Sequence, residues 1–340
     1  MSLSVEIEKK LGDFRLNVAF EAENGVLALL GASGCGKSMT LKCIAGIVTP
    51  DRGKIVLDGV TLYDSAQKVN LPPQKRRVGY LFQQYALFPN MTVEQNIAVG
   101  VRDRKKAKQT AAEMMERMRL SGLEKLKPHQ LSGGQQQRTA LARILVNEPE
   151  ALLLDEPFSA LDSHLRLQME SEVREIVREF GKPVVMVSHS QDEVYRLSDR
   201  VAVMAAGRVE SVGPKKEIFA QPQTCNGAVL TGCRNISRIR FLDDGRVWAE
   251  DWSTALDIPA GDFDCAGIRA RDIEPSEDGI PCEVEEEIEN PFSVTVTLHP
   301  SGAQGRLFWE IDKQKWSVLR GKTQRILLPA AHIQRLKESL

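Results

Sequence analysis

The 340-residue sequence contains no apolar run near the ~18–20 residues that cross a bilayer. Its first residues, MSLSVEIEKK, lack the apolar core of a signal peptide. The net charge is −1, which gives no general attraction to nucleic acid or to anionic lipid. The six cysteines show neither CxxC nor the Cys/His spacing of a zinc site. The basic run RDRKKAK has no interleaved aromatics, so a solvated helix face is favoured over a nucleic-acid patch. These absences predict a cytosolic protein with free thiols.

Residues 1–221 alternate between strand and helix patterns. Short apolar runs such as VLALLG and EALLLDEP are typical of strands buried in parallel sheets. After the first of these runs, Leu41, Ile44 and Ala45 recur at helical spacing. Residues of about 94–150 are expected to form a helical subdomain. This alternation predicts an α/β core with a mainly parallel sheet.

Residues 222–340 follow a different pattern. RNISRIRFLDDGRVWAEDW alternates around an Asp-Gly turn, and FSVTVTLHPSGAQGRLFWEI alternates on both sides of a Pro-Ser-Gly break. The pattern predicts a small all-β domain, an OB-like barrel or a sandwich. The acidic run EVEEEIE within it is expected on an exposed strand edge, where charge discourages pairing between chains.

The stretch GASGCGKS matches the phosphate-loop pattern G-x-x-x-x-G-K-[ST]. It follows a predicted strand and opens a predicted helix, which is the context that the motif requires. Its glycines let backbone N–H groups converge on phosphate oxygens. Lys37 is expected to reach the β- and γ-phosphates, and Ser38 to ligate Mg²⁺. The candidate ATP-binding residues of this loop are Gly31, Ala32, Ser33, Gly34, Cys35, Gly36, Lys37 and Ser38.

Two adjacent carboxylates, Asp155 and Glu156, end the apolar run EALLLDEP. Asp155 fits the carboxylate that holds Mg²⁺ in phosphate-loop enzymes. Glu156 is placed to polarise the attacking water. An Asp-Glu pair at a strand end is a weak signal alone, and it becomes a strong one downstream of a phosphate loop. Together the two motifs predict that the chain binds a nucleoside triphosphate with Mg²⁺.

A second glycine loop, LSGGQ at 131–135, offers a hydroxyl and backbone donors at a predicted helix N-terminus. FQQ precedes this loop, and SALD and VSHS follow it. Because these motifs occur in the order found in ABC transporters, the first two thirds of the chain resemble the ATPase subunit of an ABC transporter. The resemblance implies a homodimer packed head to tail, in which each LSGGQ loop closes over ATP held by the partner chain. The signature-loop residues are Ser132, Gly133, Gly134 and Gln135.

The same resemblance implies roles for single residues. Gln83 is expected to sense Mg²⁺ and the attacking water, and the YALFPN stretch after it to face the membrane subunit. His189 is expected to contact the γ-phosphate and the region of Glu156, although a lone histidine at a strand end is usually structural. Asp162 is expected to link the two ATP sites across the dimer. The implied Mg²⁺ ligands are Ser38, Gln83 and Asp155.

Two features of the adenine and α-phosphate contacts depart from the family pattern. The family usually presents an aromatic ring for adenine stacking from its N-terminal strands, and Phe14 is the candidate, with a core role as the alternative. Position 39 is Met, where the family usually has a hydroxyl that contacts the α-phosphate. Thr40 is the residue that would compensate for its loss.

Residues 70–100 look like ATPases of bacterial and archaeal importers fed by solute-binding proteins. The short start LGDFRLNVAFEAENG and the compact β tail look most like molybdate importers. Sulfate importers are close, and sugar, polyamine and iron importers share the layout. This resemblance implies a motor on two membrane-spanning permease subunits, peripheral at the cytoplasmic face of the membrane. The tail is expected either to be a dimerisation and regulatory scaffold or to bind the transported oxyanion, molybdate or tungstate.

Two other classes of protein compete with this interpretation. A soluble ABC protein acting on DNA or ribosomes usually carries a coiled-coil insertion or two fused cassettes, and the sequence has neither pattern. A non-catalytic sensor would use nucleotide and oxyanion as regulatory ligands. The intact set of Asp155, Glu156 and His189 favours an ATPase over such a sensor.

Overall fold

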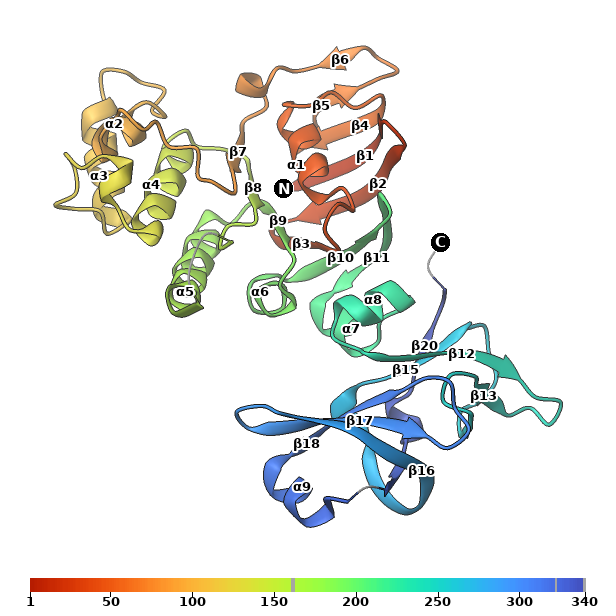
Figure 1. Ribbon diagram of the computed structural model, residues 1–340. Helices are drawn as coiled ribbons and strands as arrows, with labels where there is room; N and C mark the ends of the chain where they lie inside the picture. Colours follow the sequence, from red (N-terminus) through yellow and green to blue (C-terminus); the bar gives the residue numbers. More distant parts are fainter. Residues whose placement is uncertain (160–162, 322, 339–340) are drawn as a thin grey trace. The chain divides into compact units, whose positions relative to one another are not determined.

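The computed structural model describes residues 1–159, 163–321 and 323–338, and all of their side chains except those of 163–165 (Figure 1). The chain divides into two compact units, Met1–Lys215 and Lys216–Leu340. The first unit thus ends ahead of the boundary expected at residue 221. Across the described part of the chain, no helix is both long and apolar enough to cross a membrane.

The strands of the first unit form one eleven-stranded sheet. In chain order they are β1 (Ser2–Leu11), β2 (Phe14–Glu23), β3 (Gly25–Gly31), β4 (Arg52–Leu57), β5 (Val60–Asp64), β6 (Val69–Asn70), β7 (Val78–Leu81), β8 (Ala151–Asp155), β9 (Pro183–Ser188), β10 (Arg200–Ala205) and β11 (Arg208–Pro214). Their order across the sheet is β6-β5-β4-β1-β2-β11-β10-β3-β9-β8-β7.

The sheet has a parallel half and an antiparallel half. The neighbours β10, β3, β9, β8 and β7 run parallel, as the apolar runs predicted. By contrast, β1 pairs antiparallel with β2 and β4, and β4 pairs antiparallel with β5. The prediction of a mainly parallel sheet was therefore wrong for the half that contains β1, β2, β4 and β5. The reason is the short links, such as the Asp58–Gly59 turn with φ values of 48° and 79°, which join only antiparallel neighbours.

The first unit also contains six α-helices and two short 3₁₀ helices within its described residues. They are α1 (Lys37–Ala45), η1 (Pro73–Lys75), α2 (Val93–Ala98), α3 (Ala107–Arg117), η2 (Pro128–Gln130), α4 (Gly133–Leu145), α5 (Ser163–Phe180) and α6 (Gln191–Leu197). Helix α1 contacts β3, β8 and β9 of the parallel half, and α5 and α6 contact β3. The helices therefore cover the part of the sheet whose strands β3, β8 and β9 are buried almost throughout.

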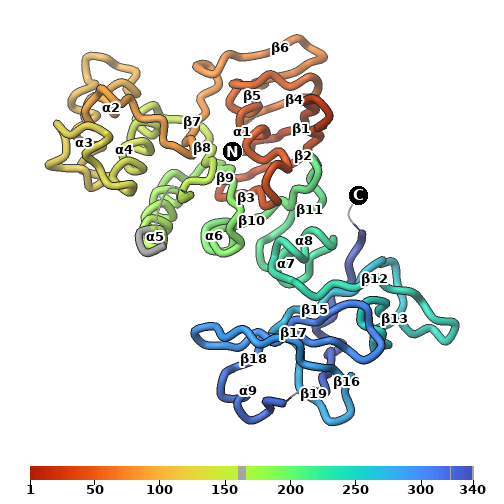
Figure 2. Tube along the Cα trace, viewed as in Figure 1, coloured from red at the N-terminus to blue at the C-terminus, as the bar shows by residue number. Residues whose placement is uncertain are grey.

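Helices α2, α3 and α4 form a separate group beside the sheet, as Figure 2 shows. They share a core of their own, to which Ile97, Ala111, Met115 and Met118 contribute buried side chains. The helical periodicity at 94–150 thus corresponds to a small packed body with its own apolar centre.

The second unit is built from two antiparallel sheets. Its strands are β12 (Asn235–Phe241), β13 (Val247–Ala249), β14 (Thr254–Leu256), β15 (Cys265–Ile268), β16 (Glu274–Glu289), β17 (Ser293–Pro300), β18 (Leu307–Asp312), β19 (Thr323–Leu327) and β20 (Gln334–Leu336). Its helices are α7 (Lys215–Ala220, which begins on the last residue of the first unit), α8 (Cys225–Leu230), η3 (Ala270–Asp272), α9 (Lys313–Leu319) and η4 (Ala330–His332). The sheet orders are β14-β13-β12-β15-β20 and β18-β17-β16-β19. Both sheets contribute to one hydrophobic core that includes Trp252, Trp309 and Trp316, so the tail is a single small β domain.

The acidic run lies in β16, whose pairing with β19 ends at Glu283. Beyond that point β16 pairs only with β17 among the described strands, at Val284 and, after an irregularity in the register, from Glu286 to Glu289. One edge of the acidic run is thus exposed, which agrees with the role of charge in discouraging edge pairing.

Arg76 fastens the C-terminal end of α1 and is only 1% exposed. Its Nη1 donates to the carbonyls of Cys43 at 2.8 Å and Ile44 at 2.9 Å, and its Nε donates to the Leu71 carbonyl at 2.7 Å. Burial lowers the pKa of Arg76, and the guanidinium is compensated by this set of acceptors. A cation at this position also complements the negative end of the helix dipole.

We expect Arg76→Met to destabilise the first unit by about 3 kcal/mol, because buried carbonyls of α1 lose their donors. The measurement is the urea midpoint of the transition assigned to this unit, since a two-unit chain need not unfold in one step. The neighbouring variant Lys75→Met, at an exposed position, is the control and should shift the free energy of unfolding by less than about 0.5 kcal/mol. Equal midpoints for the two variants would contradict this role of Arg76.

Candidate functional site

The predicted site residues follow four neighbouring parallel strands. The order β3-β9-β8-β7 places these strands side by side. The phosphate loop follows β3, His189 follows β9, Asp155 and Glu156 lie at the end of β8, and Gln83 follows β7. Because the carboxyl ends of parallel strands meet at one edge, segments distant in sequence converge there.

The phosphate loop runs from the end of β3 into α1, and glycines at two positions are required by its backbone. Gly34 and Gly36 have φ values of 81° and 106°, which L side chains rarely adopt. Lys37 is 6% exposed, and its Nζ donates to the carbonyls of Gly31 at 2.7 Å and Ala32 at 2.9 Å. The loop thus folds around its own lysine, with backbone N–H groups at the start of α1.

Phe14 stands beside this loop. A Cβ built on Gly36 would lie 3.3 Å from Phe14 Cζ. The ring is partly buried and packs against the main core, at the first residue of β2. This position is compatible with both readings of Phe14, and its stacking on adenine stays a prediction.

The hydroxyl proposed to replace the one missing at Met39 is already occupied. Thr40 is fully buried, and its Oγ1 donates to the Gly36 carbonyl at 3.0 Å. Met39 is partly buried and packs against the core. Thr40 is therefore not placed to compensate at the α-phosphate, and that expectation was wrong. The cause is helical geometry, because a threonine hydroxyl readily bonds the carbonyl four residues earlier.

Asp155 is held by two hydroxyl groups. Ser38 Oγ donates to Asp155 Oδ1 at 2.7 Å, and Tyr80 Oη donates to Asp155 Oδ2 at 2.8 Å. Burial, followed by the hydrogen bond to Asp155, raises the pKa of Tyr80, so this hydroxyl remains a donor at neutral pH. A serine hydroxyl touching a buried carboxylate fits Mg²⁺, which is usually held by one or two protein oxygens together with phosphates and water.

The three predicted catalytic residues meet at Glu156. Gln83 Nε2 donates to Glu156 Oε2 at 3.2 Å, and His189 Nδ1 lies 3.4 Å from Glu156 Oε1. The Glu156 backbone has a φ of 45°, and its N–H donates to the Val187 carbonyl at 3.0 Å. A non-glycine residue in this left-handed region is a strained position of the kind found at functional sites.

The signature loop forms the N-terminus of α4. Ser132 is the N-cap, with its Oγ accepting from the Gln135 N–H at 3.3 Å. Gln135 Oε1 accepts in return from the Ser132 N–H at 2.9 Å. Gly134 is buried beneath Met169, whose sulfur would lie 2.9 Å from an added Cβ. Helix α4 belongs to the helical group, whereas α1 lies over the sheet (Figure 1). The predicted dimer-linking residue Asp162 lies outside the described residues.

Two residues near the site were missed by sequence reasoning. Tyr80 donates a hydrogen bond to Asp155, which lies 75 residues later in the sequence. Arg143 of α4 donates to the carbonyls of Ala86 and Tyr85, which lie 57 and 58 residues earlier. A signal for Tyr80 was present, since it lies in the strand that leads to Gln83. Nothing in the local sequence singled out Arg143.

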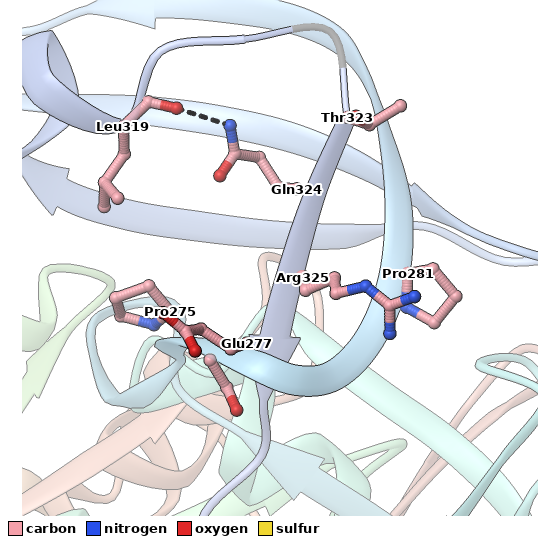
Figure 3. Close-up of a pocket in the computed structure, with 8 residues that line it drawn as sticks. Pro275, Glu277, Pro281, Leu319, Thr323, Gln324 and Arg325 are labelled. Carbon is pink, nitrogen blue, oxygen red and sulfur yellow. Dashed lines mark hydrogen bonds between the residues drawn. The ribbon is translucent and has the colours of Figure 1, made fainter.

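The second unit contains an open hollow of about 630 Å³, shown in Figure 3. Its lining residues are Pro275, Ser276, Glu277, Pro281, Leu319, Thr323, Gln324 and Arg325. The lining includes one cation, Arg325, and one carboxylate, Glu277. Arg325 Nη1 already donates to the Gly279 carbonyl at 3.2 Å. The charges of the described lining are balanced, so this hollow by itself does not favour an oxyanion.

Comparison with known proteins agrees with the geometry. Residues 16–159 match the family model described as ABC transporter. The chain is 40% identical over 261 residues to the molybdenum import ATP-binding protein ModC of Rhodospirillum rubrum, covering 76% of this chain and 70% of that protein. It is 45% identical over 222 residues to the molybdate/tungstate import ATP-binding protein WtpC of Archaeoglobus fulgidus. That match covers 65% of this chain and 90% of the relative.

Other relatives carry a different substrate in their names. The chain is 44% identical over 230 residues to the spermidine/putrescine import ATP-binding protein PotA of Methylococcus capsulatus. That match covers 66% of this chain and spans only 57% of the relative's length. Among solved structures, the dimeric ATP-binding cassette MJ0796 bound to ADP and Pi has a TM-score of 0.53 at 29% identity. The structural match covers 63% of this chain and 99% of the cassette.

The phosphate loop, the Asp155 carboxylate held by two hydroxyl groups and the Glu156 cluster lie at one edge of a parallel sheet, which is the arrangement of the nucleotide site in phosphate-loop NTPases. The matches with known proteins identify one family within this class. The chain belongs to the ATP-binding subunits of ABC transporters, a family that hydrolyses ATP with Mg²⁺.

We expect Glu156→Gln to bind ATP normally and to lower phosphate release at least about 100-fold, because the amide cannot accept a proton from water. ATP affinity is measured by equilibrium binding, and turnover by a phosphate-release assay. ATP-bound mutant chains should also accumulate as closed dimers in size-exclusion chromatography. Phosphate release at the wild-type rate would remove Glu156 from its assigned role.

Proposed function

We propose that this chain is the ATP-hydrolysing motor subunit of an ABC importer and acts as a homodimer. The convergence of Gln83 and His189 on Glu156, next to the Ser38–Asp155 pair, carries this proposal. Its test is phosphate release from ATP by the full chain in the presence of Mg²⁺. Binding of ATP without any release would instead support the non-catalytic sensor.

Within this function, the residues at the sheet edge bind the phosphates, hold Mg²⁺ and activate the attacking water. The Lys37 ammonium and the backbone N–H groups of the loop bind the phosphates. Bound Mg²⁺, held by Ser38, Asp155 and Gln83, would supply neutralisation of phosphate charge. The carboxylate of Glu156 orients the attacking water and accepts its proton, while Gln83 and His189 hold that carboxylate in place.

The signature loop acts on ATP bound by the partner chain. The location of α4 in the helical group, apart from α1, supports this assignment (Figure 1). Ser132 has an exposed hydroxyl at the N-terminus of a 13-residue helix, where backbone donors and the helix dipole favour an anion. ATP at the interface would then tie two chains together and hydrolysis would release them, which gives ATP and ADP different affinities for the closed state.

We expect Ser132→Arg to leave ATP binding by the single chain unchanged and to block hydrolysis, since a large cation fills the space that the partner's phosphate needs. Ser132→Ala is the comparison variant, because it removes the hydroxyl and the helix cap, at a cost of about 1 kcal/mol, without filling the space with a cation, so it should reduce hydrolysis less than Ser132→Arg does. The two readouts are ATP binding at low protein concentration and phosphate release at high concentration. Loss of ATP binding in the Arg variant would argue against the trans assignment.

The permease partners and the cellular location are inferred from the relatives. All three relatives described above are named import ATP-binding proteins. This chain is therefore proposed to dock on two membrane-spanning permease subunits, with a solute-binding protein acting on the far side. Its place would be peripheral, at the cytoplasmic face of the membrane.

The transported substrate is proposed to be molybdate or tungstate. This proposal is supported by the short start and the compact β tail, which look most like molybdate importers, and by two molybdenum-related relatives of which the chain spans 70% and 90%. Coverage alone does not separate the substrates, since the chain spans 74% of the spermidine/putrescine protein of Aliivibrio fischeri. A polyamine is the second candidate, favoured by the several spermidine/putrescine relatives with 43–47% identity. Sulfate or thiosulfate, iron and sugars remain further alternatives from the shared layout of these importers.

The β tail is proposed to be either a regulatory scaffold or a sensor that binds the transported oxyanion. An oxyanion would be held by N–H, hydroxyl and cationic donors. The balanced charges of the hollow beside Arg325 support the scaffold, whereas a site elsewhere in the tail would support the sensor.

We expect calorimetric titration of the full chain with molybdate and tungstate to give saturable binding at one site per chain if the tail is a sensor. Sulfate tests the neighbouring importer class, and spermidine tests the polyamine alternative. Binding of spermidine without binding of either oxyanion would overturn the molybdate assignment. With no binding at all, the tail would be a scaffold, and the ATPase function would stand unchanged.

A further inference from the structure

The backbone that follows Gln83 accepts two hydrogen bonds from a single arginine of α4. Arg143 Nη1 donates to the Ala86 carbonyl at 2.8 Å, and its Nη2 donates to the Tyr85 carbonyl at 3.0 Å. The same guanidinium lies 5.2 Å from the centre of the Phe88 ring. The planar fork of arginine suits two adjacent carbonyls, and a lysine ammonium lacks this fixed spacing of donors.

The gripped residues have an unfavourable backbone. Tyr85 and Ala86 have φ values of 58° and 45°, both in the left-handed region. Side chains of L residues clash with the backbone there, so two consecutive non-glycine residues need outside support. Arg143 supplies that support, because its two donors engage the carbonyls of these same two residues.

The gripped turn is also fastened to the segment that carries the catalytic glutamate. Tyr85 is 3% exposed, and its hydroxyl donates to the Pro157 carbonyl at 3.3 Å. Pro157 directly follows Glu156, and Tyr85 lies two positions after Gln83. The Gln83–Glu156 hydrogen bond therefore spans two segments that are held together by Tyr85.

At its other end, α4 begins with the signature loop. We propose that Arg143 is a positioning residue for ATP hydrolysis. It fixes the left-handed turn at Tyr85–Ala86, this turn sets Gln83 against Glu156, and α4 transmits the position of the signature loop to that pair. The proposal rests on the ATPase function proposed above.

The test compares steady-state ATP hydrolysis by Arg143→Met, Arg143→Lys and wild-type chains. Because misplacement of a catalytic group lowers the rate of the chemical step, we expect kcat of Arg143→Met to fall about tenfold with the ATP KM changed less than about twofold. Arg143→Lys should be intermediate, since one ammonium replaces two aligned donors. The control is Arg102→Met, which removes an exposed arginine of the helical group whose Nε donates to Asn147 at 2.9 Å.

A second variant separates positioning from general damage to the fold. Glycine adopts positive φ without strain, so Ala86→Gly added to Arg143→Met should raise kcat by about threefold or more over Arg143→Met alone. Unfolding transitions followed by circular dichroism ensure that all variants are assayed while folded.

Two results would overturn the proposal. One is an Arg143→Met kcat equal to that of Arg102→Met, and the other is a loss of kcat that Ala86→Gly leaves unchanged. Failure of the ATPase function itself would look different, since the wild-type chain would then release no phosphate.

Discussion

The parallel pairing of β3, β9, β8 and β7 is the constraint on which the site depends. Each of these strands is followed by one functional segment, and the register sets how far each segment projects. Asp155 lies opposite Val187, and the next residue, Glu156, donates its N–H to the Val187 carbonyl. A slip of one residue would turn every side chain of β8 to the opposite face and move Asp155 and Glu156 away from their partners. Burial of all residues in β8 and β9 resists such a slip.

Two arginines of the first unit hold backbone segments in place through their guanidinium groups. Arg76 binds carbonyls of α1, and Arg143 binds carbonyls of the turn after Gln83. In both cases burial lowers the pKa of the guanidinium, yet the group keeps its charge because an arginine pKa lies far above neutral. Hydrogen bonds to a charged donor are stronger than neutral ones, so one side chain holds two peptide groups in a fixed relation.

The sequence motifs located most of the candidate site, because each motif is contiguous and lies at the end of an apolar strand. The phosphate loop and the Asp155–Glu156 pair were found in this way, the family resemblance added Gln83 and His189, and the structure brings them to one edge. What the motifs did not give are contacts between distant segments, such as Tyr80 with Asp155. Local preference also misled at Thr40, whose hydroxyl bonds its own helix. The antiparallel half of the sheet was missed because two-residue turns, rather than apolar runs, decide its pairing.

A short stretch of chain lies between Arg76 and the turn at Tyr85–Ala86, which Arg143 binds. Phe82, Gln83 and Gln84 are exposed, whereas Arg76 secures the start of this region and Arg143 holds its end at Tyr85–Ala86. One fastened end belongs with α1 and the sheet, and the other with the helical group. The second end is also tied to the segment after Glu156, through the hydrogen bond from Tyr85 to the Pro157 carbonyl, and Gln83 lies at the centre of the three exposed residues. The Gln83–Glu156 hydrogen bond of 3.2 Å therefore depends on a short segment that is anchored at both ends, by Arg76 at one and by Arg143 and Tyr85 at the other.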